Sequence, residues 1–123
     1  MLPEDVLNRY MNEDLPEFAE IELTDVNQTG NFGNAPLHIA CIRGIEDEVV
    51  ALLDGGAEVN RIGELGNTPL HEAVAQGHTK IAKILLKSGA AVLPQNEFNE
   101  TPLEMARRRG LTEIVELMEK ATA

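Results

Sequence analysis

The residues best suited to chemistry in this chain are its only cysteine and two of its histidines. Cys41 follows His38 by three positions, so a helix would place thiol and imidazole on one side, as in a nucleophile paired with its base. His71 repeats His38 at a distance of 33 residues, but the residue three positions after it is Val74. Because the histidine recurs without the cysteine, we assign it to a repeat and expect the buried thiol to act as a small apolar group.

The same two histidines are the strongest candidates for a metal site. On neighbouring stacked helices they would lie about 8 to 10 Å apart, and two ligands fall short of the set that zinc takes. The sequence has no glycine-rich phosphate loop after a predicted strand, and its carboxylates are scattered over polar faces. We expect a non-enzyme with no catalytic residue, metal or cofactor. A hidden enzyme or metal site is the alternative.

These histidines belong to a repeat that runs through most of the chain. A Pro-Leu step recurs at Pro36, Pro69 and Pro102, each 33 residues after the one before. Other positions keep this register: Ala40, Ala73 and Ala106; Gly44, Gly77 and Gly110; Gly56-Ala57 and Gly89-Ala90. A period of about 20 to 50 residues marks an array in which neighbouring units must stack to make a core.

Each unit is predicted to contain two helices. Thr68 is suited to cap the first helix, Pro69 to occupy its first position, and Gly77 to end it in a left-handed conformation. Apolar residues at helical spacing predict a second helix from Thr79 to about Lys87. The stretch 60–67 carries two glycines and two asparagines, which indicates an extended turn or hairpin. The unit is therefore loop, helix, turn, helix.

The block Thr-Pro-Leu-His-Glu-Ala at 68–73 resembles the signature of the ankyrin repeat. The Leu-Leu-x-x-Gly-Ala block at 85–90 agrees in register, and the resemblance covers residues 23–119. It implies an all-α ankyrin-repeat solenoid of helix-turn-helix units joined by hairpin-like loops. The chain divides as one domain into an acidic N-terminal cap (1–29), repeat 1 (30–62), repeat 2 (63–95) and a C-terminal capping repeat (96–123).

The first and third copies depart from the family pattern. Ala35 replaces the capping threonine and Glu48 occupies a position that is usually apolar, so we expect the first unit to be less stable than the second. In the third copy Glu104 replaces the histidine, which suits a terminal unit with a polar outer face. Asn99 replaces a glycine there, and asparagine tolerates the left-handed conformation better than most residues.

The N-terminal segment fits the repeat least. Its Pro3 stands one period before Pro36, so we expect a degenerate unit that caps the array. Residues 15–23 fit either a short helix or a strand, and we favour the helix. An apolar stripe predicts a first helix ending near Met11, formed by Leu2, Val6, Leu7 and Tyr10.

Charge restricts the class of partner. The chain has a net charge of −11, and residues 1–30 carry −7 of it, with eight carboxylates and one arginine. This field repels nucleic acid and anionic lipid and attracts cationic partners; improved solubility is the alternative explanation. The arginines at 107–109 suit either a helix C-terminus or a phosphate ligand. With no signal peptide or apolar span in the sequence, we expect a cytoplasmic protein that is monomeric when free.

The family resemblance implies a binding surface on the concave face, made by the loop tips and the ends of the first helices. Phe32, Leu65 and Phe98 place one large apolar side chain in each loop; they could anchor a partner or pack on one another. Arg43 and Gln76 are the preferred contacts because the fold does not obviously require them. The predicted partner-binding residues are Asn31, Phe32, Asn34, Ile42, Arg43, Glu64, Leu65, Asn67, Ala75, Gln76, Glu97, Phe98, Glu100, Arg108 and Arg109.

Three functions follow from these features. The favoured one is a non-catalytic module that binds another protein, possibly basic, through the concave face. Its sharper form is a small acidic inhibitor, such as an immunity protein that neutralises a cationic nuclease-type toxin. A scaffold or adaptor without inhibitory activity is the alternative, and the hidden enzyme comes last.

Overall fold

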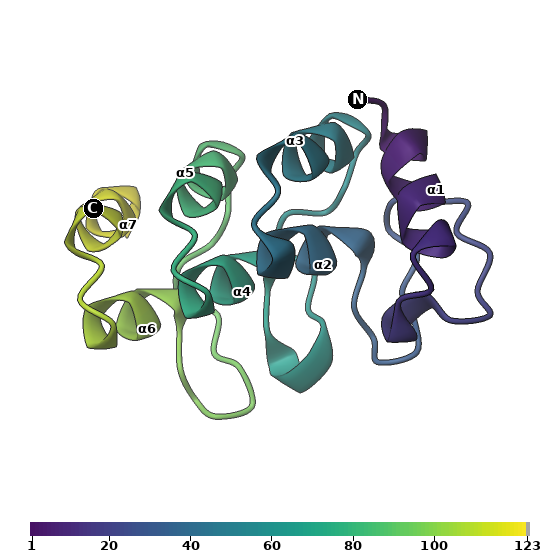
Figure 1. The fold of residues 1–123 in the computed structure, drawn as a ribbon. Helices are drawn as coiled ribbons and strands as arrows, with labels where there is room; N and C mark the ends of the chain where they lie inside the picture. The colour runs from purple at the N-terminus through teal and green to yellow at the C-terminus, as the bar shows by residue number, and fades with distance from the viewer. Residues whose placement is uncertain (123) are drawn as a thin grey trace.

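The chain folds into two rows of helices joined by loops, and the computed structural model describes residues 1–122 (Figure 1). The upper row in Figure 1 is α3 (Glu46–Asp54), α5 (Thr79–Lys87) and α7 (Thr112–Thr122), and α1 (Pro3–Asn12) stands beside α3 at the N-terminal end and runs down towards the lower row. The lower row is α2 (Pro36–Arg43), α4 (Pro69–Ala75) and α6 (Pro102–Arg108). Two short 3₁₀ turns, η1 (Pro16–Phe18) and η2 (Glu64–Gly66), lie in the loops. Residues 1–122 contain no strand, which confirms the all-α prediction.

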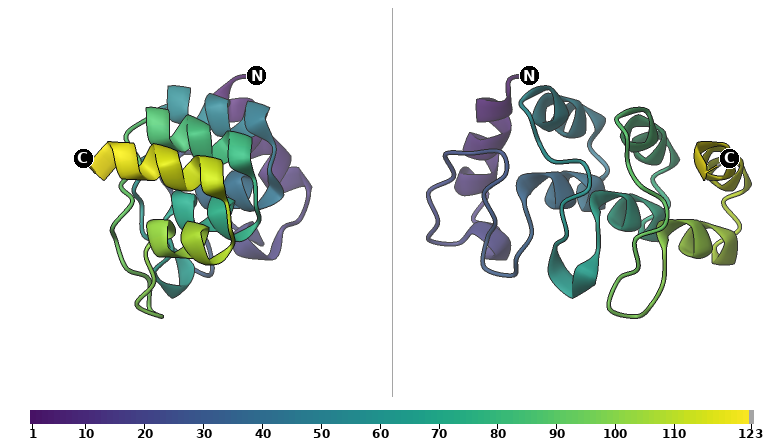
Figure 2. Two further views of the ribbon diagram at one scale, coloured as in Figure 1. Left: turned by 90° about the vertical axis from the view of Figure 1, so that its left-hand side faces the viewer. Right: turned by 180° about the vertical axis from the view of Figure 1, so that it is seen from behind.

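Successive helical hairpins stack side by side. Helices α2 and α3, α4 and α5, and α6 and α7 pack as pairs, while α4 lies between α2 and α6 and α5 lies between α3 and α7. The view along the array shows the hairpins one behind another (Figure 2). Each unit therefore makes its core with its immediate neighbours, as an array requires.

Local sequence signals set the limits of each first helix. The Thr68 hydroxyl accepts a hydrogen bond from the backbone N–H of His71, and Pro69 is the first helical residue of α4. Gly44 and Gly77 follow the lower-row helices with φ of +74° and +71°, a conformation that suits glycine. A Cβ atom at Gly44 would also lie 2.6 Å from the His78 ring. The predicted helix starts and stops are confirmed.

The core lies between the two rows. Leu37 and Leu70 from the lower row and Leu52 and Leu85 from the upper row are almost completely buried, and burial of each such side chain contributes about 1.5 to 3 kcal/mol. Fully buried alanines allow the lower-row helices to approach closely: Ala40, Ala73 and Ala106. Small residues and aliphatic residues thus fill an interior that has few aromatics.

The repeated histidines join each unit to the next. The Nδ1 atom of His38 accepts from the backbone N–H of Ala35, and its Nε2–H donates to the carbonyl of Arg61 at 2.9 Å and to that of Asn67, in the next unit, at 3.2 Å. In the next unit, His71 donates from Nε2–H to the carbonyl of Glu100 at 2.8 Å. Burial lowers the pKa of both imidazoles, which favours the neutral form that donates and accepts at once. The predicted structural role of these histidines is confirmed.

The N-terminal helix takes a different place from the one its register predicts. Pro3 is in phase with the first residue of a lower-row helix, but α1 packs against α3 in the upper row (Figure 1). Val6, Leu7 and Tyr10 are buried as expected, whereas Leu2 caps the helix with 64% of its surface exposed, so its assignment to the apolar stripe is wrong. In the segment 15–23, the favoured short helix is the single 3₁₀ turn η1.

A buried carboxylate explains the placement of α1. Glu48 on α3 is fully buried and accepts hydrogen bonds from the Tyr10 hydroxyl at 2.6 Å and from Arg9 Nη1 at 2.8 Å. The Tyr10 ring stacks on Phe18 with 6.0 Å between centroids. Burial, together with the Glu48 carboxylate, raises the pKa of Tyr10 and keeps its hydroxyl protonated as a donor. The polar residue at this normally apolar position therefore fastens the cap to the array.

Candidate protein-binding surface

Three loops leave the helix rows on the side of α2, α4 and α6 (Figure 1). At its tip each loop exposes one large apolar side chain: Phe32 is 53% exposed, Leu65 is 48% exposed and Phe98 is 69% exposed. Ile62 and Leu93 are also exposed, earlier in the second and third loops. Side chains that packed on one another would be largely buried, so this alternative does not fit the observed exposure. The three loops instead present apolar groups to solvent at intervals of one repeat.

Hydrogen bonds connect the first loop to the cap and to the second loop. Asn34 is buried, and its Nδ2 donates to Glu17 Oε1 at 2.7 Å while its Oδ1 accepts from the backbone N–H of Glu64 at 2.9 Å. The other oxygen of the buried Glu17 accepts from the backbone N–H of Phe32 at 2.7 Å. Asn34 thus serves inside the protein, although the sequence analysis placed it among the partner contacts.

The second and third loops are joined in a similar way. The backbone N–H of Glu97 donates to the carbonyl of Leu65 at 2.9 Å, and Asn96 Nδ2 donates to Asn67 Oδ1 at 3.0 Å. Leu65 and Asn99 adopt the left-handed conformation, each with φ of +60°. Leucine is costly in this conformation, so the loop holds Leu65 in a strained turn that its hydrogen bonds support. The expectation that Asn99 replaces a left-handed glycine is confirmed.

The predicted contact residues differ in how accessible they are. Asn34 is buried, and five others are partly buried: Ile42, Arg43, Asn67, Ala75 and Glu100. The exposed ones are Asn31, Phe32, Glu64, Leu65, Gln76, Glu97, Phe98, Arg108 and Arg109. The loop tips and the ends of α4 and α6 therefore form the accessible part of the set.

Arg43 has a role that the sequence analysis missed. Its guanidinium donates to both carboxylate oxygens of Glu13, at 2.5 and 3.2 Å, and lies 5.3 Å from the centre of the Tyr10 ring. Its Nε is also 3.9 Å from Glu48. These contacts cross the interface between the cap and the first repeat. The premise that the fold does not require Arg43 is wrong, because its partners lie in the segment that has no repeat register.

The arginines at 107–109 do not act as one cluster. Arg108 makes two hydrogen bonds to the Glu100 carboxylate, at 2.8 and 3.0 Å, which lower the pKa of Glu100. Arg107 lies 3.7 Å from Glu119 on α7. Each of these two side chains is thus directed to a carboxylate of its own. Their geometry is that of structural ion pairs rather than of a shared phosphate site.

A half-buried carboxyl on α4 was not singled out by the sequence. Burial, with a smaller contribution from the nearby Glu64, raises the pKa of Glu72 to about 7. Glu72 occupies the variable position of the repeat block, in register with Ile39 and Met105. A glutamate at a repeat position that is apolar in the other two copies was the one sequence signal that this carboxyl is unusual. An incoming cation would favour the ionised form of Glu72 and release a proton.

The described structure offers little for catalysis or metal binding. Cys41 is buried, and burial raises the pKa of its thiol, so the reactive thiolate is disfavoured. No hydrogen bond joins Cys41 to His38 among the described residues. Within residues 1–122, no group of three or more histidine, cysteine, aspartate or glutamate side chains is arranged to hold a metal ion. The notable features of this surface are apolar side chains and carboxylates.

Comparison with protein families gives an independent result. The model of ankyrin repeats matches residues 6–96 in three copies, and such repeats are in general modules of protein–protein interaction. The match begins within α1, so it includes the divergent segment that caps the array. None of the curated proteins compared with the chain matches it. No helix within the described residues has the length and apolarity to cross a membrane.

Proposed function

The chain belongs to the ankyrin-repeat family, and we propose that it binds a folded, basic partner protein through its loop tips and the end of α4, without catalysis. The observation that carries this proposal is the row of Phe32, Leu65 and Phe98, each about half exposed or more on a hydrogen-bonded loop. Apolar side chains that are held in fixed positions and surrounded by polar groups are the usual anchors of an interface.

Rigid loops also favour binding for an entropic reason. The links through Asn34 and between Leu65 and Glu97 restrict the loops before a partner arrives. A partner then loses less binding free energy to loop ordering than it would with mobile loops. This pre-organisation supports the loops as a recognition surface rather than as simple connections.

Carboxylates near the loops support a basic partner. Glu64 and Glu97 are exposed beside the apolar tips, and Glu72 on α4 is near enough to Glu64 for their charges to interact. The net charge of −11 adds a long-range field of the same sign. Complementary charge of this kind raises the association rate and excludes anionic competitors.

An inhibitory role is the sharper form of the proposal. Small size and acidic charge suit a chain that neutralises a cationic toxin of the nuclease type, in the manner of an immunity protein. The same surface would serve a scaffold that only joins proteins. The partner's own activity, measured with and without the chain, separates the two roles: inhibition at equimolar chain supports the first, and unchanged activity supports the second.

Paired capture tests the proposed surface. Three chains are immobilised: wild type, a variant with Phe32, Leu65 and Phe98 changed to serine, and the control Ile62→Ser. The experiment compares the proteins that each of them retains from a native extract. Ile62 is also an exposed apolar residue, but it lies outside the predicted contact set. We expect a basic protein to be retained by wild type and Ile62→Ser and lost by the triple variant. Equal retention by all three would contradict the proposal.

A further inference from the structure

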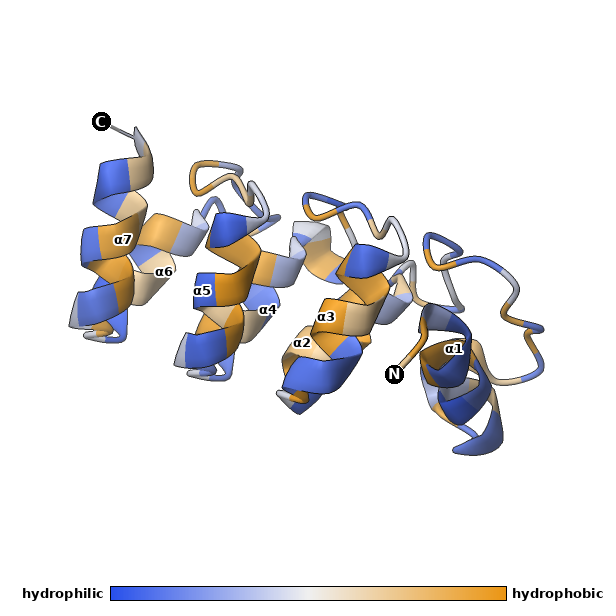
Figure 3. Ribbon diagram, turned by 90° about the horizontal axis from the view of Figure 1, so that it is seen from above, coloured by the Kyte–Doolittle hydropathy of each residue, from blue (hydrophilic) through white to orange (hydrophobic). Residues whose placement is uncertain are grey.

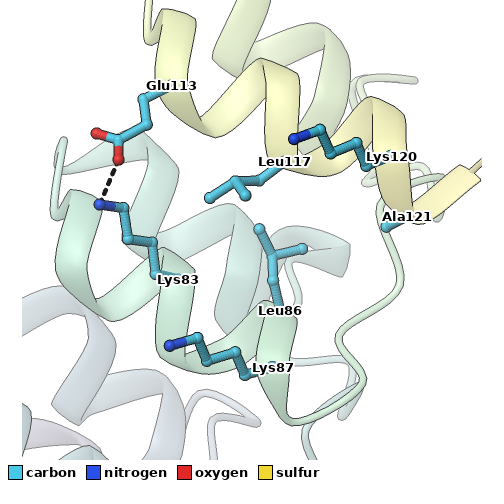
Figure 4. A pocket seen from close by; sticks show the side chains of 7 residues that line it. All are labelled: Lys83, Leu86, Lys87, Glu113, Leu117, Lys120 and Ala121. Carbon is cyan, nitrogen blue, oxygen red and sulfur yellow. Dashed lines mark ion pairs between the residues drawn. The ribbon is translucent and has the colours of Figure 1, made fainter.

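A groove on the opposite row of helices combines apolar and basic groups. It lies between α5 and α7 and encloses about 490 Å³ (Figure 4). Leu86 and Leu117 are partly buried and lie opposite each other between the two helices (Figure 4). Figure 3 shows hydrophobic bands on both helices beside hydrophilic ones. The groove thus has an apolar centre that remains open to solvent.

Lysines surround this centre. The chain has four lysines, and three of them line the groove: Lys83, Lys87 and Lys120. Lys83 forms an ion pair with Glu113 across the groove (Figure 4). Lys87 and Lys120 form no ion pair with any residue among 1–122. In a protein of net charge −11, this is a local concentration of positive charge.

The fold does not demand lysine at these positions. Lys87 and Lys120 are in register with Asp54 at the end of α3, and Lys83 is in register with Val50. Cations near a helix C-terminus gain from the helix dipole, but α3 ends without one. The dipole suits Lys87 and Lys120 in the last turns of α5 and α7, but it does not explain Lys83 in the middle of α5. It therefore does not explain why three of the four lysines line one groove.

We propose that this groove binds an acidic segment of a partner protein, with one apolar side chain between Leu86 and Leu117 and carboxylates on Lys87 and Lys120. Charge decides the class of occupant. An anionic membrane would be repelled by the net negative charge of the whole molecule. A short acidic peptide responds mainly to charges within about one Debye length, roughly 8 to 10 Å, and in the groove these include the lysines. Because the groove lies on the upper row, away from the loops, both surfaces can be occupied at once.

Fluorescence anisotropy tests the groove directly. The probe is a short fluorescein-labelled peptide in which glutamates flank one leucine and one phenylalanine, and the control peptide has lysines in place of the glutamates. We expect the acidic peptide to bind, and we expect the basic peptide, added unlabelled, not to displace it from the groove. Binding should weaken with salt because exposed charges are screened. No anisotropy change at up to about 1 mM protein, where even weak binding would register, would overturn the proposal.

A matched pair of charge reversals locates the site. Lys87→Glu and Lys80→Glu change α5 by the same charge, but only Lys87 lines the groove. Both residues are exposed, so both variants should fold. We expect Lys87→Glu to weaken peptide binding about tenfold and Lys80→Glu about twofold at most. Equal weakening of peptide binding by the two variants would overturn the assignment. It would also be overturned if sodium decanoate, an anionic fatty acid, displaced the peptide while Lys87→Glu bound the peptide as tightly as wild type.

Discussion

Among single residues, Glu48 shows most clearly how a polar side chain can strengthen an array. Removal of its carboxylate leaves the buried Tyr10 hydroxyl without its acceptor and Arg9 without its partner. An unpaired buried polar group costs about 1 to 3 kcal/mol, and loss of the ion pair with the partly exposed Arg9 adds to this cost. We predict that Glu48→Ala lowers the free energy of unfolding by about 3 kcal/mol.

Urea denaturation measures this change. Glu46→Ala is the matched control, because Glu46 lies on the same helix and is exposed. The control should change the free energy of unfolding by no more than about 0.5 kcal/mol. Equal stability of the two variants would show that Glu48 does not fasten α1 to α3.

The second residue-scale prediction concerns pH. The folded-state pKa of Glu72, about 7, is above the ordinary value for a glutamate. The folded protein therefore holds this proton more tightly than the unfolded chain, and the resulting stability is present below the ordinary pKa and lost as pH rises through about 7. We predict that Glu72→Gln raises stability at pH 8 by about 1 to 2 kcal/mol, after allowance for partial exposure.

Urea denaturation between about pH 5 and pH 8 is the measurement. The gain from Glu72→Gln should shrink towards pH 5, where wild-type Glu72 is already mostly protonated in the folded state. The exposed Glu104 on α6 provides Glu104→Gln as the control. A gain that did not depend on pH would mean that the carboxyl of Glu72 is ionised like any surface group.

At the scale of elements, the loops are held by side chains from other units. Asn34→Ala removes the bonds that join the first loop to Glu17 and to the backbone of Glu64. We predict that hydrogen exchange at the Phe32 and Glu64 amides accelerates by about tenfold or more, since one lost hydrogen bond of about 1.4 kcal/mol corresponds to this factor. Gln95→Ala, at an exposed position of the third loop, should leave these amides unchanged.

The helical hairpins could be predicted from sequence because their signals are local. Thr68, Pro69 and Gly77 specify where α4 begins and where its hairpin turns, and the period carries this information to the other units. The packing of α1 against α3 could not be predicted this way. It depends on the hydrogen bonds that Glu48 accepts from Arg9 and Tyr10, which are far from it in the sequence. No periodic pattern encodes such pairs.

The candidate surface was predictable to a similar extent. Repeat register identified Phe32, Leu65 and Phe98, and their exposure fits an interface. Register could not show that Asn34 points inward or that Arg43 bonds to Glu13, because both side chains meet the non-repeated cap. The role of a side chain was thus predictable where it and its hydrogen-bond partner both belong to the repeat, as with the histidines.

For the whole molecule, charge governs how a partner approaches. The net charge of −11 acts over distances that salt shortens, from about 10 Å at 0.1 M to about 3 Å at 1 M. We predict that association with the captured basic partner slows by about tenfold between 50 and 500 mM salt, while dissociation changes less. Stopped-flow fluorescence gives both rates. An association rate independent of salt would remove electrostatic steering from the account.

Distribution of charge also separates the two proposed surfaces. The loops present carboxylates and apolar tips, whereas the groove between α5 and α7 presents lysines around leucines. A partner suited to one surface is repelled by the other, so the two sites are expected to bind different proteins. One short array could then hold a basic and an acidic partner on opposite rows.

NMR chemical-shift mapping tests the central claim, that the loops are the recognition surface, most directly. The labelled 123-residue chain is titrated with the captured basic partner, and the backbone amides are followed by residue. We predict the largest shifts at residues 31–34, 64–67 and 97–100 and at Gln76. Shifts confined to α3, α5 and α7, with the loops unchanged, would contradict this account.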